Sequence, residues 1–359
     1  MRAVNAASPA TRDPGDVARS LGVSREAVEL CWSAETVDLH IDSFIWSRVF
    51  GYDVTKRHGR GLLGARGYSQ VDLPRLAEAR IGSALWSITT NPLRTADGRA
   101  RALADNLATF KAWIAAAPDR WELVRTADEH AAARARGVHA VFLSIQGGNA
   151  LDHADASVLD ERSFVAVTLV HLSNSTLGTT SSPLRSARTS GLTARGTELV
   201  KRLNATRTFV DLAHISPAGF ADAVRAHDKT QPLMVSHTGL SGAHPLWRNI
   251  DDAQLKQVAD TGGVVGVIFH SAYLGDPYWG AGKVDRIAEH LQHIARVVGA
   301  DHAALGSDWD GAIVTPRDMP TCSELPRLAQ ALLDRGMAHE AIHKMFGGSY
   351  LRALRLLRG

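Results

Sequence analysis

Several polar side chains that could bind a metal or act on a substrate stand directly after short apolar runs. They are His40, Asp42, Gln146, His171, His214, His237 and Asp308. Imidazole nitrogens and carboxylate oxygens together form a ligand set that suits zinc. One histidine after an apolar run is usually structural, but three after successive runs, with acids after two others, predict a metal centre. The metal would lower the pKa of a bound water molecule to about 7 and polarise a carbonyl group.

The acids at the two ends of this series have more than one interpretation. His40 and Asp42 are two positions apart, so on an extended segment both side chains point to the same side. Taken alone, that pair would fit a buried structural contact equally well. Asp308 would either bind a metal or act as a base toward water. Asp310 precedes Gly311, and because Asp-Gly is a strong turn signal we expect a turn residue there.

Gln146 precedes two glycines, Gly147 and Gly148. A double glycine indicates a backbone that turns sharply or approaches another group closely. The amide oxygen of Gln146 can bind a metal, although weakly. The alternative is a hydrogen-bonded polar side chain at the end of a strand.

The apolar runs alternate with amphipathic helical segments, which predicts a (β/α)8 barrel, also called a TIM barrel. We expect strands at residues 37–40, 81–88, 138–145, 164–169, 209–212, 233–236, 264–269 and 303–306. These runs are rich in Val, Ile, Leu and Ala with little polar alternation, as in buried parallel strands. A doubly wound open sheet is the alternative, but no glycine-rich nucleotide fingerprint follows the first run. In a barrel the polar residues above would meet at one mouth, where barrel enzymes carry their sites.

The chain has 359 residues, a length that single barrels often reach. We expect a barrel domain over residues 35–359 and an N-terminal extension over residues 1–34 that is helical or partly disordered. Residues 54–67 carry several basic side chains and glycines. We favour a solvated mobile loop for this segment, and a lid over the barrel mouth is the alternative.

Composition and charge argue against several classes of protein. The net charge of +3 is small and not clustered, so we expect no binding to nucleic acid. Cys31 and Cys322 cannot form a disulfide framework and fit a reducing compartment. No run approaches the roughly 20 apolar residues of a membrane span, and the N-terminus lacks the apolar core of a secretory signal. We therefore expect a cytoplasmic protein without membrane contact.

Several short motifs, in order along the chain, resemble those of the membrane dipeptidase family. This family is also called renal dipeptidase or peptidase family M19, and it belongs to the amidohydrolase superfamily. The motifs are Q-V-D-L-P-R-L at residues 70–76, T-L-V-H-L-S-N at 168–174, G-L-T-A-R-G at 191–196, D-L-A-H at 211–214, S-H at 236–237, R-N at 248–249 and G-S-D-W-D-G at 306–311. The similarity covers nearly all of the chain beyond about residue 35.

The resemblance implies a site with two zinc ions, the metal count of the family. His40 and Asp42 would hold one zinc ion, and His214 and His237 would hold the other. Asp308 would stand beside them as a further metal ligand. A homodimer is expected from the resemblance alone.

The resemblance also implies roles toward a dipeptide substrate. His171 would bind the scissile carbonyl oxygen and stabilise the oxyanion. Arg248 would pair with the terminal carboxylate of the substrate, which a guanidinium group fits well. Asp308 would take the proton of the nucleophilic water and pass it to the leaving amine.

The chain departs from the family at the metal-bridging position. Gln146 stands where the family has a glutamate, because residues 144–149 read S-I-Q-G-G-N instead of G-I-E-G-G-H. A neutral amide does not supply the bridging charge, so we expect weaker metal binding or a single metal. His270 stands where the family has an aromatic residue. It would be an extra ligand, a substrate contact or part of a polar wall.

Three functions follow from these features. The first is a zinc-dependent hydrolase of a dipeptide or similar small amide with a free carboxylate. The second is a relative with one metal, or little metal, that acts on a different small substrate. The third is a barrel that binds a small molecule without catalysis.

Overall fold

Parallel strands form a closed barrel in the computed structural model, which describes residues 12–359 apart from 62, 92, 155–156, 161, 185–188 and 277–281. The barrel strands are β1 (Val37–Ile41), β2 (Ser83–Thr89), β4 (His139–Gln146), β5 (Phe164–Thr168), β6 (Phe209–Asp211), β7 (Met234–Thr238), β8 (Val264–Val267) and β9 (Ala303–Leu305). Each strand pairs in parallel with the next, and β9 pairs with β1. The predicted TIM barrel is confirmed, and the bounds of every predicted strand lie within two residues of those observed.

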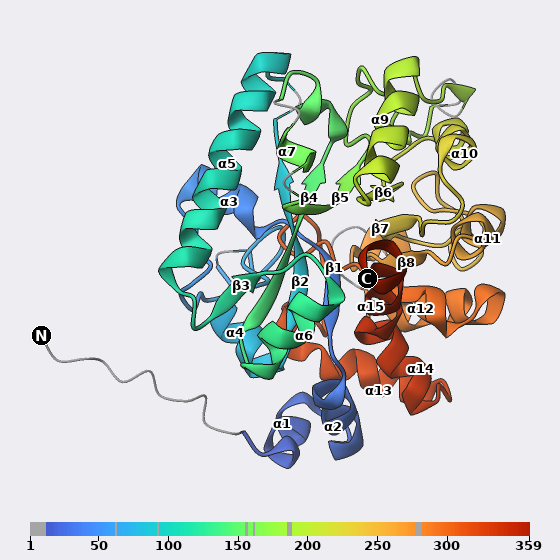
Figure 1. The fold of residues 1–359 in the computed structure, drawn as a ribbon. Helices are drawn as coiled ribbons and strands as arrows, with labels where there is room; N and C mark the ends of the chain where they lie inside the picture. The colour runs from blue at the N-terminus through green and yellow to red at the C-terminus, as the bar shows by residue number, and fades with distance from the viewer. Residues whose placement is uncertain are drawn as a thin grey trace, which may run out of the picture.

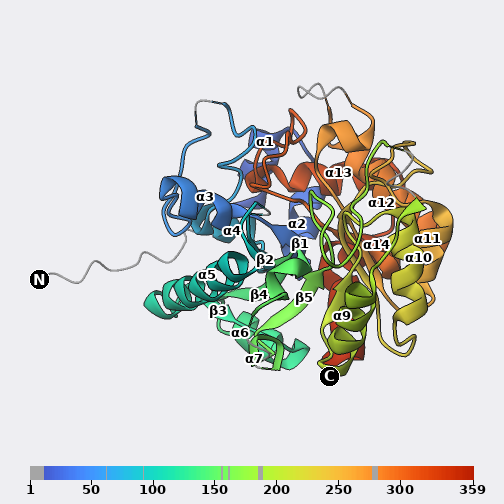
Figure 2. The same cartoon turned by 90° about the horizontal axis from the view of Figure 1, so that it is seen from above.

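Helices surround the strands, as the view from above in Figure 2 shows. They are α3 (Ser43–Phe50), α4 (Leu73–Ala79), α5 (Ala96–Ala116), α6 (Ala127–Ala135), α7 (Ser157–Asp160), α9 (Ala194–Ala205), α10 (Pro217–Ala226), α11 (Asp252–Ala259), α12 (Asp285–Val298), α13 (Pro326–Asp334), α14 (His339–His343) and α15 (Ser349–Arg358). Side-chain caps fix several helix starts: Asp72 before α4, Thr95 before α5 and Ser216 before α10 each accept a hydrogen bond from the first turn. None of the helices among the described residues is long and apolar enough to cross a membrane.

A further strand, β3 (Trp121–Leu123), was not predicted. It pairs with His139–Val141 at the start of β4, whereas the later part of β4 pairs with β5 on the same edge. Three residues are too few to show a periodic pattern in the sequence. The strand thus widens the barrel wall at the end away from the mouth.

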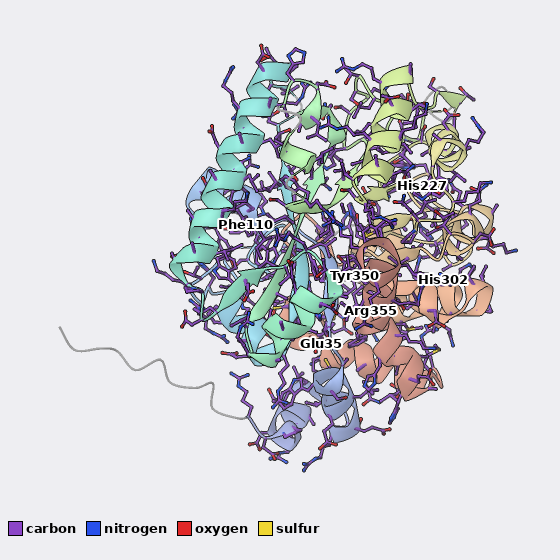
Figure 3. The ribbon with its side chains drawn as sticks, in the orientation of Figure 1. Glu35, Phe110, His227, His302, Tyr350 and Arg355 are labelled. Atoms are coloured by element: carbon purple, nitrogen blue, oxygen red, sulfur yellow. The ribbon has the colours of Figure 1, made fainter. Side chains whose placement is uncertain are left out.

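Side chains alternate between the two faces of the barrel wall. On β2, Trp86 belongs to the main hydrophobic cluster between strands and helices, and Leu85 belongs to a second cluster. Phe142 of β4 and Phe209 of β6 join that second cluster, and since these strands are not neighbours, their side chains meet inside the barrel. Tyr350 of α15 packs on Phe142 with ring centroids 5.3 Å apart, and Figure 3 shows Tyr350 beside the strands. The polar side chains near the ends of β2 and β4 therefore face the barrel interior at its mouth.

Two helices precede the barrel, α1 (Pro14–Leu21) and α2 (Arg25–Ser33), at the bottom of Figure 1. Ala27, Leu30 and Cys31 of α2 are buried and belong to the main hydrophobic cluster. The described part of the extension is thus helical and packs on the barrel through α13. The division of the chain at residues 34 and 35 stays a prediction.

Arg75, a buried residue of α4, fixes the backbone around residues 54–67. Its Nη1 donates to Ser69 O over 2.8 Å, and its Nη2 donates to Gly59 O over 3.1 Å. The basic side chains of the segment are exposed, as expected for a solvated loop: Lys56, Arg57, Arg60 and Arg66. The loop is therefore solvated on its outer side and hydrogen-bonded on its inner side.

Asp310 and Gln70 hold the loop that follows β9. Gln70 N donates to Asp310 Oδ1 over 2.7 Å, and Asp310 N donates to Gln70 Oε1 over 2.7 Å. Ser43 Oγ donates to the other carboxylate oxygen of Asp310. Asp310 has a φ of 65°, which agrees with the predicted turn. These hydrogen bonds hold the loop that places Asp308, two residues before Asp310, at the barrel mouth.

Two glycines allow the ends of β7, β8 and β9 to approach each other closely. A Cβ atom on Gly266 would lie 2.1 Å from Ser236 O, and a Cβ atom on Gly306 would lie 1.9 Å from the same oxygen. Both distances are far below van der Waals contact, and the obstacle is backbone rather than a flexible side chain. Glycine is therefore required at both positions for this geometry of the mouth.

We predict that Gly306→Ala destabilises the protein. The added methyl group forces the strand ends apart, and overpacking of this kind costs about 1–3 kcal/mol. Urea unfolding would measure the loss in the free energy of unfolding. Gly59→Ala is the matched control because nothing lies within 4 Å of the added Cβ. Equal stability of the two variants would show that the close approach is not a constraint.

Candidate metal centre

The mouth of the barrel brings His40, His237 and Asp308 together. His40 lies on β1, His237 lies on β7 and Asp308 follows β9. All three are buried, and one ligand atom from each lies within 4.8 Å of the others. The centroids of the two imidazole rings are 4.1 Å apart. Residues from three separate parts of the sequence thus form one compact set of metal-binding atoms.

His40 Nε2 is a buried nitrogen without a hydrogen bond in the described structure. The nearest carboxylate oxygens are Asp42 Oδ2 at 3.5 Å and Asp308 Oδ1 at 3.9 Å. Leaving a buried polar atom without a partner costs free energy. A cation among these atoms would provide the missing partner, so the donor set fits a metal.

His214 extends the cluster toward β6. Its Nε2 lies 2.8 Å from His237 Nε2, and its ring lies at right angles to that of His171 with centroids 4.8 Å apart. His214 has a φ of 64° and Asp308 a φ of 62°. Non-glycine residues adopt this left-handed region rarely, and such residues concentrate at functional sites. The backbone thus turns at both positions.

A chain of hydrogen bonds orients His237. Asp211 Oδ2 accepts a hydrogen bond from Ser236 Oγ over 2.6 Å, and Ser236 Oγ lies 2.9 Å from His237 Nδ1. Because the hydroxyl hydrogen points to Asp211, His237 Nδ1 carries the hydrogen toward Ser236. This tautomer leaves the Nε2 lone pair of His237 available for a metal.

Asp38 has a similar supporting position on β1. Its Oδ1 accepts hydrogen bonds from His40 N and Ser307 N, both over 3.0 Å, which ties β1 to the segment after β9. Neither Asp38 nor Asp211 was predicted to have a role at the site. A signal was present, since each is an acid that stands two or three positions before a predicted ligand histidine, His40 or His214.

Gln146 lies at the mouth but contacts the cluster through Thr89. Thr89 Oγ1 donates to Gln146 Oε1 over 2.8 Å and lies 3.3 Å from Asp42 Oδ1. Gln146 is buried, and Thr89 and Gln146 are partners in the pairing of β2 with β4. The amide oxygen thus already accepts a hydrogen bond, which agrees with the simpler interpretation of Gln146.

The burial of so many ionisable groups changes their proton affinities. Burial raises the pKa of Asp308 to about 8, although His40 lowers it. Burial lowers the pKa of His40, but the carboxylates of Asp42, Asp308 and Asp211 together raise that pKa to about 9. Burial lowers the pKa of His214 and of His237 well below the ordinary histidine value. Protons on His40 and Asp308 therefore offset the acids, and a cation would replace those protons.

Arg248 lies buried beside the cluster, where its Nη2 donates to His237 O over 3.1 Å. Its Nε has no hydrogen-bond partner among the described residues, and none of their carboxylates forms an ion pair with it. Burial lowers the pKa of Arg248, because the charged form is taken out of water. A buried guanidinium of this kind is ready to accept an anionic group of a ligand.

His270 does not belong to the cluster of His40, His237 and Asp308. Its Nδ1 accepts a hydrogen bond from Val314 N over 3.2 Å, and its ring packs on Tyr273 with centroids 4.6 Å apart. Tyr273 in turn lies beneath the Arg248 guanidinium, 6.0 Å from its ring centroid. Of the three roles expected for His270, this position favours the polar wall.

Comparison with known proteins identifies the family. The sequence pattern of the membrane dipeptidase family (peptidase family M19) matches residues 24–358. The chain is 27% identical to dipeptidase aclJ of Aspergillus oryzae over 339 residues, covering 88% of this chain and 76% of that protein. It is 36% identical over 171 residues to an uncharacterised protein in the pqqA 5′ region of Klebsiella pneumoniae, covering 46% of this chain and 60% of that relative, less than two thirds of its length.

Solved structures share the fold. The dipeptidase AC, a metallopeptidase of family M19, superposes with a TM-score of 0.79 at 24% identity, covering 90% of this chain and 99% of that one. A metallopeptidase of Rhodobacter sphaeroides, bound to a phosphinate mimic of the dipeptide L-Ala-D-Ala, gives 0.76 at 23% identity with the same coverage. With the family pattern spanning nearly the whole barrel, the chain belongs to the membrane dipeptidase family, peptidase family M19, a family of metal-dependent dipeptide hydrolases.

Proposed function

We propose that this protein is a zinc-dependent hydrolase that cleaves a dipeptide or a similar small amide with a free carboxylate. The observation that carries the proposal is the cluster of His40, His237 and Asp308, whose ligand atoms lie within 4.8 Å of one another. Family membership supports the same chemistry. The expected homodimer and the cytoplasmic location stay predictions.

The proposal includes two metal positions, which follow from the family resemblance. His40 and Asp42 would hold one zinc ion, and His214 and His237 would hold the other, with Asp308 beside them. A bound zinc ion would act as a Lewis acid toward a carbonyl group and make water nucleophilic near neutral pH. Gln146 would contribute at most a neutral oxygen, because its side chain is an amide, and Thr89 donates a hydrogen bond to that oxygen.

The remaining polar groups would bind the substrate and move protons. Arg248 would pair with the terminal carboxylate, since its Nε has no hydrogen-bond partner and no carboxylate among the described residues forms an ion pair with it. Burial lowers the pKa of His171 to about 4, so this ring is neutral at pH 7 and would donate an N–H to the scissile carbonyl oxygen. The Asp308 carboxylate would accept the proton of the attacking water and deliver it to the leaving amine.

A second candidate function rests on Gln146. Without a carboxylate between them, less negative charge offsets the repulsion between two cations at one site. A relative with one metal that acts on another small substrate is therefore the alternative, and a barrel that only binds a small molecule is the third.

We predict that the purified protein retains about one zinc ion per chain after dialysis and binds a second ion more weakly. The physical reason is the missing anion between the two positions. Elemental analysis against buffers of defined free zinc would count the ions. Two tightly held ions would contradict the effect assigned to Gln146, and no bound zinc would favour the non-catalytic barrel.

We predict that Gln146→Glu strengthens binding of the second zinc ion by about 10–100-fold, the range over which groups around a metal change its affinity. At limiting zinc, kcat/KM for a dipeptide rises in the same variant, and at saturating zinc the two proteins converge. Gln146→Leu is the control, because it removes the oxygen without adding charge. If Gln146→Glu creates activity in a protein otherwise inactive at saturating zinc, ordinary dipeptide hydrolysis is not the natural role.

We predict that Arg248→Met lowers kcat/KM for a dipeptide by about 10–100-fold, because a hydrogen bond to a charged group contributes about 1.5–3 kcal/mol. The same substitution has little effect on a dipeptide amide, which lacks the carboxylate. Zinc content measured in both proteins controls for damage to the metal site. An equal loss on both peptides would remove Arg248 from carboxylate recognition.

A further inference from the structure

A cavity of about 630 Å³ opens beside the metal-ligand cluster, against α3 and the N-terminal half of α5. Thr89 and His171 both line this cavity. Thr89 Oγ1 lies 3.3 Å from Asp42 Oδ1, so the cavity and the candidate metal centre share a wall. A substrate held at the metal centre would therefore reach into this cavity.

Three arginines line the cavity: Arg48, Arg94 and Arg101. Arg48 Nη2 donates to Thr89 O over 2.8 Å, which fixes that guanidinium at the edge of the site. Within the described parts of the chain, none of the three forms an ion pair with a carboxylate, although Asp105 also lines the cavity. Asp42 attracts Arg48 and Asp97 attracts Arg101 without forming an ion pair. The lining still carries three positive charges against the one negative charge of Asp105, so it favours an anionic ligand.

The rest of the wall combines apolar side chains with one buried amide. Ile45, Val49 and Leu172 provide the apolar part. Asn106 is only 7% exposed, and its Nδ2 has no hydrogen-bond partner in the described structure. A short carbon chain that ends in an anionic group matches both parts of this wall.

The cavity and Arg248 lie on opposite sides of the mouth. Arg248 holds His237 O at the end of β7, whereas Arg48 holds Thr89 O at the end of β2. Around the barrel, β1, β9 and β8 separate these strands in one direction, and β4, β5 and β6 separate them in the other. A substrate whose carboxylate pairs with Arg248 would thus extend its acyl part toward the three arginines.

We propose that the cavity lined by Arg48, Arg94 and Arg101, the arginine pocket, binds a second anionic group on the acyl part of the substrate. The preferred substrate is then a dipeptide or small amide with an acidic N-terminal residue. The inference rests on the proposed function, because it takes Arg248 as the partner of the terminal carboxylate. It goes beyond that function because it states that the N-terminal residue of the substrate is acidic.

The test compares L-Glu-L-Ala with L-Gln-L-Ala, which differ by one charge at nearly equal size. We expect kcat/KM to favour L-Glu-L-Ala by about tenfold, which corresponds to about 1.4 kcal/mol. The double substitution Arg94→Gln and Arg101→Gln brings the ratio close to one. Arg19→Gln with Arg25→Gln is the matched control, because it removes the same charge from α1 and α2 at the far end of the molecule and leaves the ratio unchanged.

The salt dependence of the substrate preference separates an effect of charge from structural damage by the substitutions, because structural damage would not depend on salt. Exposed charges are screened over about 10 Å at 0.1 M salt and about 3 Å at 1 M. The ratio of kcat/KM for L-Glu-L-Ala to that for L-Gln-L-Ala therefore falls with rising salt in the unsubstituted protein. In the Arg94→Gln, Arg101→Gln protein this ratio is already close to one and does not change with salt. A preference that survives high salt or the double substitution overturns the inference.

Binding of uncleavable analogues separates this inference from the proposed function. The probes are analogues of both peptides in which a CH2–NH group replaces the amide, titrated calorimetrically into the protein as purified. Tighter binding of the glutamyl analogue that is lost in the double variant supports the arginine pocket. This holds even if neither peptide is hydrolysed in the presence of zinc. Absence of hydrolysis would overturn only the hydrolase proposal. Hydrolysis of both peptides at equal rates, with equal binding of both analogues, overturns only the pocket.

Discussion

The structure depends on the burial of imidazoles and carboxylates at the mouth of a narrow barrel. His40, Asp42, His237 and Asp308 are all withdrawn from water. Burying a charged group costs free energy unless an opposite charge lies beside it. Burial raises the pKa of Asp308 to about 8, and the neighbouring carboxylates raise the pKa of His40 to about 9. The mouth is thus a site prepared for positive charge.

Hydrogen bonds to neighbouring acids hold the candidate ligand histidines in place. Asp38 fixes the backbone of His40, and Asp211 fixes the ring of His237 through Ser236. Partners of this kind orient metal-binding side chains and select their tautomers, and their loss commonly weakens a metal site. Gln146 differs from the predicted acidic ligands because its amide carries no charge, and Thr89 donates a hydrogen bond to its oxygen. Asp38 and Asp211 thus support the candidate site, and Gln146 adds no charge to it.

Much of this arrangement could be predicted from the sequence. The barrel follows from the alternation of apolar runs and helical segments, and the site follows from polar residues at the ends of those runs. The sequence could not show that Asp38 and Asp211 support the ligands, because a supporting acid and a ligand acid look alike in a strand pattern. It also missed β3, since Trp121–Leu123 is too short to show periodicity. The close approach at Gly306 depends on distances between strands that only a folded barrel defines.

The two sets of arginines at the mouth differ in their surroundings, and this difference bears on selectivity. Arg248 is buried, so its attraction for an anion acts through a low dielectric and is screened little by salt. Arg94 and Arg101 are exposed, and their attraction is weaker and falls with ionic strength. A ligand with one carboxylate would therefore occupy the Arg248 end first. The arginine pocket can discriminate only among ligands already anchored there, so it acts on the choice of substrate and contributes little to anchoring it.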